Sequence, residues 1–486
     1  MENNKLSEKR NLSMLMDFYE LTMANGYYTK DMDDTIVYFD MFYRKNPDQG
    51  GFSIVAGLEQ VIEYVKNLKF TDEDISYLRG RKIFSEDFLN YLKNFKFTGD
   101  IYAIPEGTPV FPYEPLLTVK AKAIEAQLLE TMILLTINHQ SLIATKTNRI
   151  VRAAKGRAVM EFGARRAQGF DAAVYGARAA YIGGVVGTAT TLADEIFGVP
   201  ALGTMAHSWI QMFECEYEAF KAYAENYPDD CTLLIDTYNV INSGIPNAVR
   251  VAKEVLEPMG KRLKGVRLDS GDIAYLSNRC REMLDEAGLS DCKIVASNSL
   301  DEYIITDLFD QGAKLDSFGV GERLITAKSE PVFGGVYKLA AIERNEEIIP
   351  KIKISENAEK VTNPGFKKVW RLFDKNTNKA IADVIALANE VIDESKPYVI
   401  FDEIHTWKKK KVTKFIAQEL QVPIFINGEC VYDMPTLNEI KQYCKNEVNN
   451  LWNEVKRFTN PHQYYVDLSE DLWKCKQDMI NQFSFK

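Results

Sequence analysis

The chain has 486 residues, of which 46% are hydrophobic and 26% are charged, with a net charge of −10 at pH 7. This composition is that of a globular protein and excludes a chain that is disordered throughout. The acidic balance argues against a nucleic-acid-binding protein, because such proteins are usually basic. It leaves room for small anionic substrates at a locally positive site. The length predicts two or three domains.

The sequence carries no targeting or spanning signal. The first ten residues include no apolar signal region, and no apolar run reaches the roughly 18 residues of a membrane span. The seven cysteines are scattered without a CxxC pair, so neither a zinc site nor a disulfide framework is signalled. We therefore expect a soluble, cytoplasmic protein with reduced thiols, no membrane or nucleic-acid partner and no fixed metal site in the protein.

Residues 1–135 have a mixed pattern that predicts an N-terminal α+β domain. Residues 33–42 alternate enough to be a strand, and residues 57–68 have helical spacing. The segment 107–115 is rich in proline and cannot be a regular helix. Residues 121–135 are interpreted as an amphipathic helix that leads into the next domain.

In residues 136–340 the sequence pattern changes to short apolar runs that alternate with helical stretches. This alternation predicts a parallel sheet with crossover helices. About seven such units favour an irregular (β/α) barrel, although an open doubly wound sheet fits the same spacing. The apolar runs are 158–162, 185–189, 201–203, 232–235, 265–268, 293–296 and 315–318. Residues 341–486 are rich in lysine and glutamate and predict short strands with a helical tail.

Polar side chains follow every apolar run of this region. In a parallel barrel the carboxyl ends of all strands lie on one face, so these groups would converge on a single mouth. Their convergence indicates an enzyme. They are Glu161, Arg165 and Arg166; Thr188, Thr190 and Thr191; Thr204 and His207; Asp236; Arg267, Asp269, Ser270 and Asp272; Ser297, Asn298 and Ser299; and the segment 319–323.

Two of these clusters indicate a particular chemistry. Gly319 and Gly321 stand between a strand and a helix, where backbone N–H groups can bind a phosphate. The pattern lacks a third glycine and a GK[ST] motif, so it is neither a dinucleotide fingerprint nor a P-loop; a tight turn is the alternative. Arg267 suits a carboxylate and Asp269 suits sugar hydroxyls, the alternative being that Asp269 or Ser270 caps the next helix.

The motifs together resemble nicotinate phosphoribosyltransferase, from about residue 14 to about residue 387. The resemblance is specific because separate motifs occur in the expected order. They are Asp17-Phe-Tyr-Glu-Leu-Thr-Met-Ala24, Glu161-Phe-Gly-Ala-Arg-Arg-Ala-Gln-Gly169, Gly203-Thr-Met-Ala-His-Ser208, Val266-Arg-Leu-Asp-Ser-Gly-Asp272, Phe318-Gly-Val-Gly321 and Gly334-Gly-Val-Tyr-Lys338.

This resemblance implies the reaction of nicotinate with 5-phosphoribosyl 1-pyrophosphate to give nicotinate mononucleotide and pyrophosphate for NAD synthesis. It implies that ATP phosphorylates His207, that hydrolysis of the phosphohistidine favours the product, and that Mg²⁺ is required. Such an enzyme is a phosphoribosyltransferase that is also classed as a ligase. The implied fold is an irregular barrel with a flanking α+β domain built from the N- and C-terminal segments. The implied homodimer places Tyr19 in the partner's site.

The resemblance also assigns residues to substrates. Tyr19 and Phe162 would enclose the pyridine ring, and Thr204 and Arg267 would hold the nicotinate carboxylate. Asp236 is a candidate to orient the His207 ring, as carboxylates commonly do. The residues implied for 5-phosphoribosyl 1-pyrophosphate are Arg165, Asp269, Ser297, Gly319, Gly321 and Thr326. Which of Arg165 and Arg166 faces the site stays open.

Three alternatives remain at this stage. Nicotinamide phosphoribosyltransferase would need an acidic residue after the second strand, and residues 187–191 contain none. Quinolinate phosphoribosyltransferase is usually much shorter and has no phosphorylated histidine. A non-catalytic barrel that binds a sugar phosphate would need the phosphate glycines but not His207 and Asp236 together.

Overall fold

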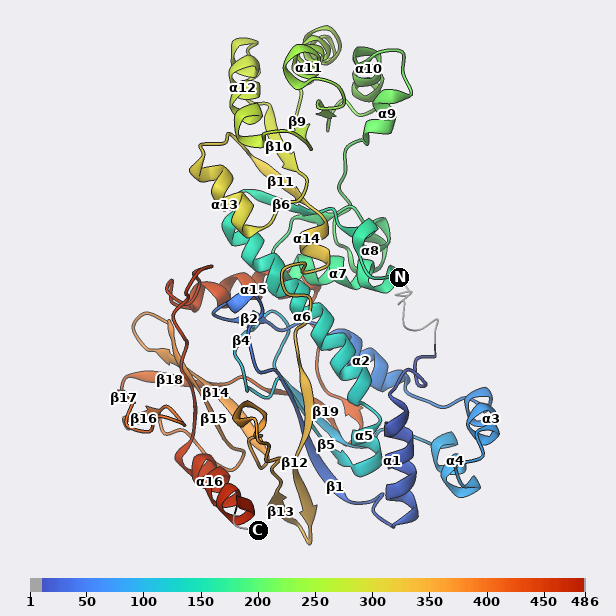
Figure 1. The fold of residues 1–486 in the computed structure, drawn as a ribbon, viewed down its shortest axis with the longest axis vertical. Helices are drawn as coiled ribbons and strands as arrows, with labels where there is room; N and C mark the ends of the chain where they lie inside the picture. The colour runs from blue at the N-terminus through green and yellow to red at the C-terminus, as the bar shows by residue number, and fades with distance from the viewer. Residues whose placement is uncertain (1–10, 485–486) are drawn as a thin grey trace. The chain divides into compact units, whose positions relative to one another are not determined.

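The computed structural model describes residues 11–484, which form two compact units (Figure 1). Lys146–Pro331 is one unit, and the described residues on either side of it make up the other. The N- and C-terminal segments thus build one α+β unit, as the resemblance implies. The expected domain bounds, 1–135, 136–340 and 341–486, stay predictions.

The unit Lys146–Pro331 is built on a six-stranded sheet in which every pair of neighbours is parallel. Residues 294–296 at its centre are buried, as expected for a strand covered on both faces. In sheet order the strands are β7 (Gly187–Thr188), β6 (Ala158–Glu161), β11 (Ser317–Val320), β10 (Lys293–Ser297), β9 (Gly265–Leu268) and β8 (Thr232–Leu234).

The predicted irregular barrel is confirmed as a curled parallel sheet that stays open at one seam. The run 201–203 contributes a single parallel bridge, between Thr188 and Ala201. Pro200 has no N–H to donate, and the chain leaves the sheet at Gly203. Among the described residues, Ala201 does not pair with β8 at the other end of the sheet.

Helices and short helical turns connect these strands (Figure 1). Asp272 caps α12, because its side chain accepts a hydrogen bond of 3.0 Å from the N–H of Tyr275. Asp269 and Ser270 are therefore not the cap of this helix. The connecting elements are η2 (Ala164–Arg166), α7 (Phe170–Gly183), α8 (Thr191–Phe197), α9 (His207–Gln211), α10 (Glu216–Asn226), η3 (Val240–Gly244), α11 (Ile245–Val251), η4 (Ala252–Leu256), η5 (Glu257–Met259), α12 (Ile273–Glu286), α13 (Glu302–Asp310) and α14 (Glu322–Ile325).

The other unit contains a seven-stranded antiparallel sheet and a four-stranded sheet. In order, the larger sheet has β13 (Glu347–Pro350), β12 (Val336–Arg344), β1 (Ile36–Phe42), β5 (Leu117–Lys122), β3 (Asp100–Ala103), β19 (Val422–Ile426) and β20 (Glu429–Cys430). The smaller has β18 (Phe415–Glu419), β14 (Lys367–Asp374), β15 (Ala380–Leu387) and β21 (Val466–Leu468). Two-stranded pairs are β2 (Ser53–Ile54) with β4 (Pro109–Val110) and β16 (Tyr398–Phe401) with β17 (Lys409–Val412).

The helix predicted over residues 121–135 is wrong at its start and in its middle. Ala121 lies in β5 opposite Val37 of β1, and the helical stretch is divided into α5 and α6 at residues 128–129. The helical elements of this unit are α1 (Phe18–Thr29), η1 (Pro47–Gln49), α2 (Leu58–Asn67), α3 (Asp72–Gly80), α4 (Glu86–Lys93), α5 (Ala123–Gln127), α6 (Glu130–Ala153, which continues past Thr145 into the other unit), η6 (Ala358–Lys360), α15 (Leu437–Asn450) and α16 (Glu470–Ser484).

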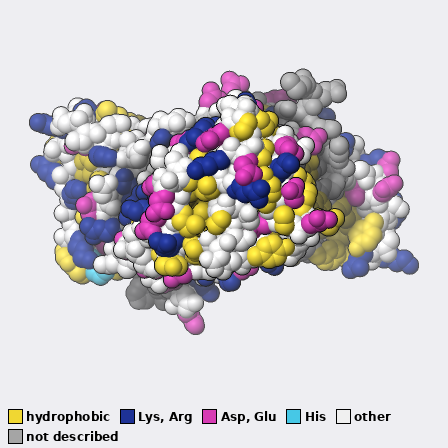
Figure 2. All heavy atoms as spheres, turned by 90° about the horizontal axis from the view of Figure 1, so that it is seen from above, with side chains coloured by type: hydrophobic (Ala, Val, Ile, Leu, Met, Phe, Trp, Pro, Cys, Tyr) yellow, Lys and Arg dark blue, Asp and Glu magenta, His cyan; other side chains and the backbone are white. Residues whose placement is uncertain are grey.

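The described helices include none that is both long enough and apolar enough to span a membrane. On the face shown in Figure 2, lysine and arginine side chains are interspersed with aspartate and glutamate side chains.

Candidate active site

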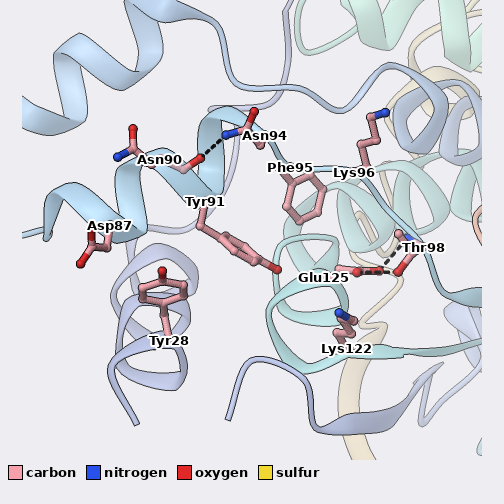
Figure 3. Close-up of a pocket in the computed structure, with 10 residues that line it drawn as sticks. All are labelled: Tyr28, Asp87, Asn90, Tyr91, Asn94, Phe95, Lys96, Thr98, Lys122 and Glu125. Carbon is pink, nitrogen blue, oxygen red and sulfur yellow. Dashed lines mark hydrogen bonds between the residues drawn. The ribbon is translucent and has the colours of Figure 1, made fainter. Parts of the chain in front are cut away.

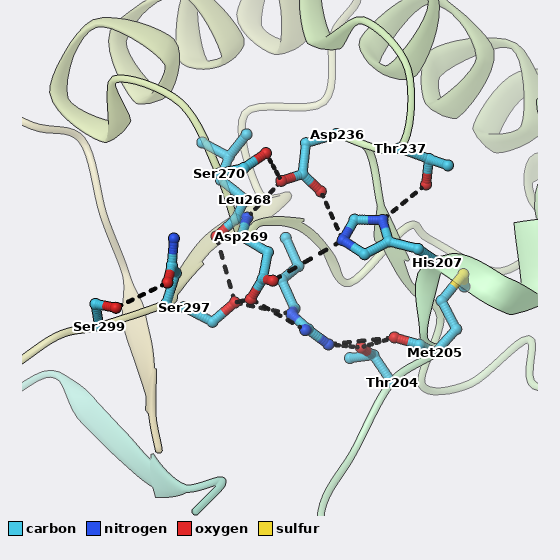
Figure 4. A network of polar contacts seen from close by, with 12 residues as sticks. Thr204, Met205, His207, Asp236, Thr237, Leu268, Asp269, Ser270, Ser297 and Ser299 are labelled. Atoms are coloured by element: carbon cyan, nitrogen blue, oxygen red, sulfur yellow. Dashed lines mark hydrogen bonds and ion pairs between the residues drawn. The ribbon is translucent and has the colours of Figure 1, made fainter. Parts of the chain in front are cut away.

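The strand ends of the unit Lys146–Pro331 gather several of the polar side chains that the sequence predicts there. Asp236 follows β8, Asp269 follows β9, and Ser297 is the last residue of β10. Thr204 and His207 arrive from the segment that leads into α9. Figure 4 shows these side chains turned toward one another in a single polar network. The predicted convergence on one edge of the sheet is therefore present.

Arg267 is the centre of this network. Its Nη1 donates to Thr204 Oγ1 at 2.8 Å and to the Met205 carbonyl oxygen at 3.2 Å. Its Nε donates to Ser297 Oγ at 3.0 Å, and its Nη2 donates to Asp269 Oδ1 at 3.3 Å. A guanidinium group has five N–H donors, so these four bonds leave one N–H for a ligand.

Asp269 is held as an anion. Burial works to raise its pKa, but a hydrogen bond from Ser297 and the charge of Arg267 outweigh burial and lower the pKa below its ordinary value. Its Oδ2 lies 3.9 Å from Nε2 of His207. The carboxylate therefore presents a negative charge to the open side of the network, where its side chain is 32% exposed.

His207 lies between carboxylates on one side and a hydroxyl on the other (Figure 4). Nε2 is 4.0 Å from Oδ1 of Asp236, and Nδ1 is 3.1 Å from Oγ1 of Thr237. Asp236 Oδ2 accepts hydrogen bonds from Ser270 Oγ at 2.6 Å and from the N–H of Asp269 at 2.9 Å. Asp236 Oδ1 is buried and has no hydrogen-bond partner among the described residues.

Phe162 and Gly319 stand next to the network. The Arg267 Cζ atom lies 5.9 Å from the centroid of the Phe162 ring. Gly319 pairs with Ser297 across β10 and β11, and a Cβ atom at Gly319 would lie 2.5 Å from the Phe162 ring. The close approach of this ring, rather than a tight turn, requires glycine at 319. The prediction that both glycines stand between a strand and a helix is wrong for Gly319, which lies within β11 and pairs with residues on both sides. Gly321 follows β11 and lies before α14.

Thr326 lines a separate hollow of about 340 Å³ in the same unit. Arg166 lines it and Arg165 does not, although Arg165 is exposed. Lys328 donates to Glu322 at 2.7 Å and holds the pKa of that carboxyl below its ordinary value. Arg166 Nε also lies 3.9 Å from Glu322 Oε2, so the two cations share one carboxylate and leave one positive charge for an anion such as a phosphate. The lining residues are Arg166, Gln168, Glu322, Thr326, Lys328 and Pro331.

Glu161 does not face the network, although it ends β6. It is completely buried, and it accepts hydrogen bonds from the N–H of Gly163 and, at 2.6 Å, from Thr188 Oγ1. Burial raises the pKa of this carboxyl above its ordinary value. Glu161 therefore stabilises the turn that follows the strand and is not available to a substrate.

Tyr19 belongs to the other unit, near the start of α1. The residue is 43% exposed, and partial burial together with Glu130 raises the pKa of its hydroxyl. Its place beside nicotinate stays a prediction.

A hollow of about 480 Å³ also lies in that other unit (Figure 3). Two of its charged groups have protein partners: Lys122 donates to Asp34 at 2.5 Å, and Glu125 accepts from Thr98 at 2.7 and 2.8 Å. The lining residues are Tyr28, Asp87, Asn90, Tyr91, Asn94, Phe95, Lys96, Thr98, Lys122 and Glu125. The strand-end network is the stronger candidate for catalysis.

The sequence did not single out Thr237, and it placed Ser270 only among the polar groups of the mouth or as a helix cap. Both directly follow a predicted site residue, Asp236 or Asp269, at the end of a strand. That adjacency is the signal that could have found them.

Comparisons with known proteins place these residues in a family. Models of the nicotinate phosphoribosyltransferase N-terminal domain, family and C-terminal domain match residues 14–138, 157–383 and 366–476, respectively. A nicotinate phosphoribosyltransferase of Bacillus subtilis is 46% identical and aligns over 97% of this chain and 96% of its own length.

Solved structures agree with this match. The human nicotinic acid phosphoribosyltransferase structure superposes with a TM-score of 0.83 at 27% identity, covering 97% of this chain and all 100% of its own. A nicotinate-nucleotide pyrophosphorylase of Pyrococcus furiosus superposes with a TM-score of 0.70 at 26% identity, covering 92% of this chain and 97% of its own.

Proposed function

Because the chain belongs to the nicotinate phosphoribosyltransferase family, we propose that it forms nicotinate mononucleotide and pyrophosphate from nicotinate and 5-phosphoribosyl 1-pyrophosphate in NAD biosynthesis. The observation that carries this proposal is the Arg267 network at the strand ends, beside Phe162. It offers an aromatic face, a cation and an anionic carboxylate within one site.

The base would lie against Phe162 with its carboxylate toward Arg267 and Thr204. The remaining N–H of Arg267 can donate to a carboxylate oxygen, and the Thr204 hydroxyl lies 2.8 Å from the same guanidinium. A carboxylate interacts with this cation more strongly than a neutral amide does. The site thus favours nicotinate over nicotinamide.

The transferred ribosyl group would lie toward Asp269. Its C1 atom becomes oxocarbenium-like as the bond to pyrophosphate breaks, and nearby carboxylate charge stabilises that centre. The phosphate ends of the substrate would meet the backbone around Gly319 and Gly321 and the Arg166–Lys328 hollow. Arg165 stays a candidate for the same substrate on the family pattern.

Mg²⁺ fits this site as an ion that arrives with the substrate phosphates. Asp269 Oδ2 is the accessible carboxylate oxygen, because the Asp269 side chain is 32% exposed and that of Asp236 is 1% exposed. Mg²⁺ is commonly held by one or two carboxylates together with substrate phosphates. When bound, it would neutralise charge that develops on the leaving pyrophosphate.

We further propose that ATP phosphorylates His207 at Nδ1. The buried Oδ1 of Asp236 lacks a donor and faces Nε2, so the favoured tautomer carries its proton on Nε2. The Nδ1 lone pair then forms the N–P bond, while the P–O bond to ADP breaks and its electron pair leaves with ADP. Asp236 and Asp269 stabilise the imidazolium that results, and phosphohistidine hydrolysis drives transfer toward the product.

The function is tested by measuring pyrophosphate release with nicotinate or nicotinamide, each with and without ATP. We expect release with nicotinate and 5-phosphoribosyl 1-pyrophosphate, and a higher rate when ATP and Mg²⁺ are present. Release that needs nicotinamide would favour nicotinamide phosphoribosyltransferase. Binding of the sugar phosphate without release would favour a non-catalytic protein.

A further inference from the structure

The hydroxyl of Thr237 makes the only hydrogen bond of the His207 imidazole among the described residues, at 3.1 Å from Nδ1. Both carboxylates lie farther from the ring, with Nε2 to oxygen distances of 3.9 and 4.0 Å. These distances exceed that of a hydrogen bond. The ring is also 39% exposed, so packing alone does not fix its orientation.

We propose that Thr237 is a positioning residue, whose hydroxyl holds the ring orientation and the tautomer that leave Nδ1 as the phosphoryl acceptor. This inference rests on the proposed phosphorylation of His207. Thr237 follows Asp236 directly at the end of β8, so one turn of chain supplies a group to each side of the ring.

The charges around the ring decide which atom donates in this hydrogen bond. If Nδ1 carried the proton and Thr237 accepted it, the lone pair of Nε2 would face two carboxylates, and one of them, Asp236 Oδ1, would stay buried without a donor. If Thr237 donates, Nε2–H points to Asp236 and both contacts are favourable. The Thr237 hydroxyl therefore donates to the Nδ1 lone pair in the resting protein. Because Nδ1 has only this one lone pair, the hydrogen bond breaks as the phosphoryl group approaches, and the hydroxyl turns to a phosphoryl oxygen while the lone pair forms the N–P bond.

The orientation of the ring depends on the same contact. A half-turn about the Cβ–Cγ bond would place Cδ2 beside Thr237 and Cε1 beside the carboxylates, and neither carbon can replace the nitrogen. Without the hydroxyl, only the two longer carboxylate contacts oppose that turn. The fraction of molecules with Nδ1 in place should then fall by roughly two- to tenfold, the range for one net hydrogen bond.

The test compares Thr237→Val with Thr237→Ser. Valine has the shape of threonine without the hydroxyl, and serine keeps the hydroxyl without the methyl group. We expect Thr237→Val to slow labelling by γ-labelled ATP by roughly two- to tenfold, and Thr237→Ser to label at close to the wild-type rate. Melting temperatures of the three proteins serve as the control for folding.

A ¹⁵N NMR spectrum of the wild-type His207 ring supplies a second measurement that needs no variant. We expect a protonated Nε2 and an unprotonated Nδ1. A protonated Nδ1, a wild-type labelling rate in Thr237→Val, or equal losses in both variants would overturn the inference. Absence of label from the wild-type protein would instead contradict the proposed phosphorylation, and the NMR spectrum would still decide the Thr237 contact.

Discussion

At the scale of single residues, the guanidinium of Arg267 has two tasks. It is placed to receive the base, and it also binds Thr204, Ser297 and Asp269. A side chain with both tasks cannot be shortened without loosening the groups around it. Lysine keeps the charge but lacks the planar fork, so it does not replace these contacts.

We predict that Arg267→Ala raises the KM for nicotinate by orders of magnitude, because truncation of one partner of a buried charge pair costs roughly 2–5 kcal/mol. Arg267→Lys should recover only part of the loss. Steady-state kinetics of pyrophosphate release measure both variants. An unchanged KM in Arg267→Ala would mean that another cation, such as Arg165, binds the carboxylate.

A second prediction concerns His207. His207→Asn should abolish the acid-labile, base-stable label from γ-labelled ATP, because the amide offers no comparable nucleophile. Some transferase activity without ATP should remain, because the histidine drives the reaction and does not attack the ribose. Radiolabelling and circular dichroism check the chemistry and the fold. Label that persists in His207→Asn would rule out this acceptor.

The sequence located most of the network, because Asp236, Asp269 and Ser297 each stand where a strand ends. The partners within the network were not predictable in the same way. The contact between His207 and Thr237 depends on the directions in which side chains from two separate segments point. A linear sequence pattern does not contain that information. The four hydrogen bonds of Arg267 to protein acceptors depend on distances that sequence spacing does not determine.

At the scale of elements, helix α1 is tied to the start of α6 by the buried carboxyl of Glu20. Glu20 Oε1 accepts hydrogen bonds from the N–H groups of Asp17 at 3.3 Å and Thr131 at 3.2 Å, and also from the Thr131 hydroxyl. Its Oε2 is buried without a partner among the described residues. Burial, opposed by the Thr131 bond and reinforced by Glu130, raises the pKa of Glu20 from 4.5 to about 7.

This raised pKa predicts a pH dependence. The folded form binds the proton of Glu20 more tightly than the unfolded chain does. The contribution of Glu20 to the free energy of unfolding is therefore fully present below pH 4.5 and is lost as the pH rises through about 7. Glu20→Gln should therefore flatten the decline of the melting temperature between these values. The exposed Glu73 of α3 provides the matched control, Glu73→Gln. Equal slopes for wild type and Glu20→Gln would contradict the prediction.

Element boundaries were the least predictable level. The apolar positions of residues 121–135 suit one helix, but pairing of Ala121 with β1 gives its backbone sheet hydrogen bonds instead. Likewise, residues 201–203 read as a strand, yet only Ala201 forms a bridge. Tertiary pairing overrides local periodicity in both places.

At the scale of the whole molecule, spacing could not choose between a barrel and an open doubly wound sheet. Both place parallel strands and helices in alternation along the chain, although they differ in whether the outer strands meet and in whether helices cover one face of the sheet or both. The curled sheet with one open seam lies between these two possibilities. The expected sharing of sites between two subunits also belongs to this scale.

We predict that Tyr19→Ala and Asp269→Ala are each nearly inactive alone and complement each other when refolded together. In a homodimer with shared sites, a mixed dimer has one site with both changes and one with neither, so about a quarter of all sites are intact under random pairing. The recovered activity should elute with the dimer on gel filtration. An inactive mixture that contains mixed dimers would place Tyr19 outside the partner's site.

The most direct test of the central claim is a competition for the phosphoribosyl group. Purified protein is given 5-phosphoribosyl 1-pyrophosphate, Mg²⁺ and ATP with equal concentrations of nicotinate and nicotinamide, and the products are separated and quantified. The account predicts that nicotinate mononucleotide dominates and that its excess falls in Arg267→Ala. A dominant nicotinamide mononucleotide product, or no mononucleotide at all, would contradict it.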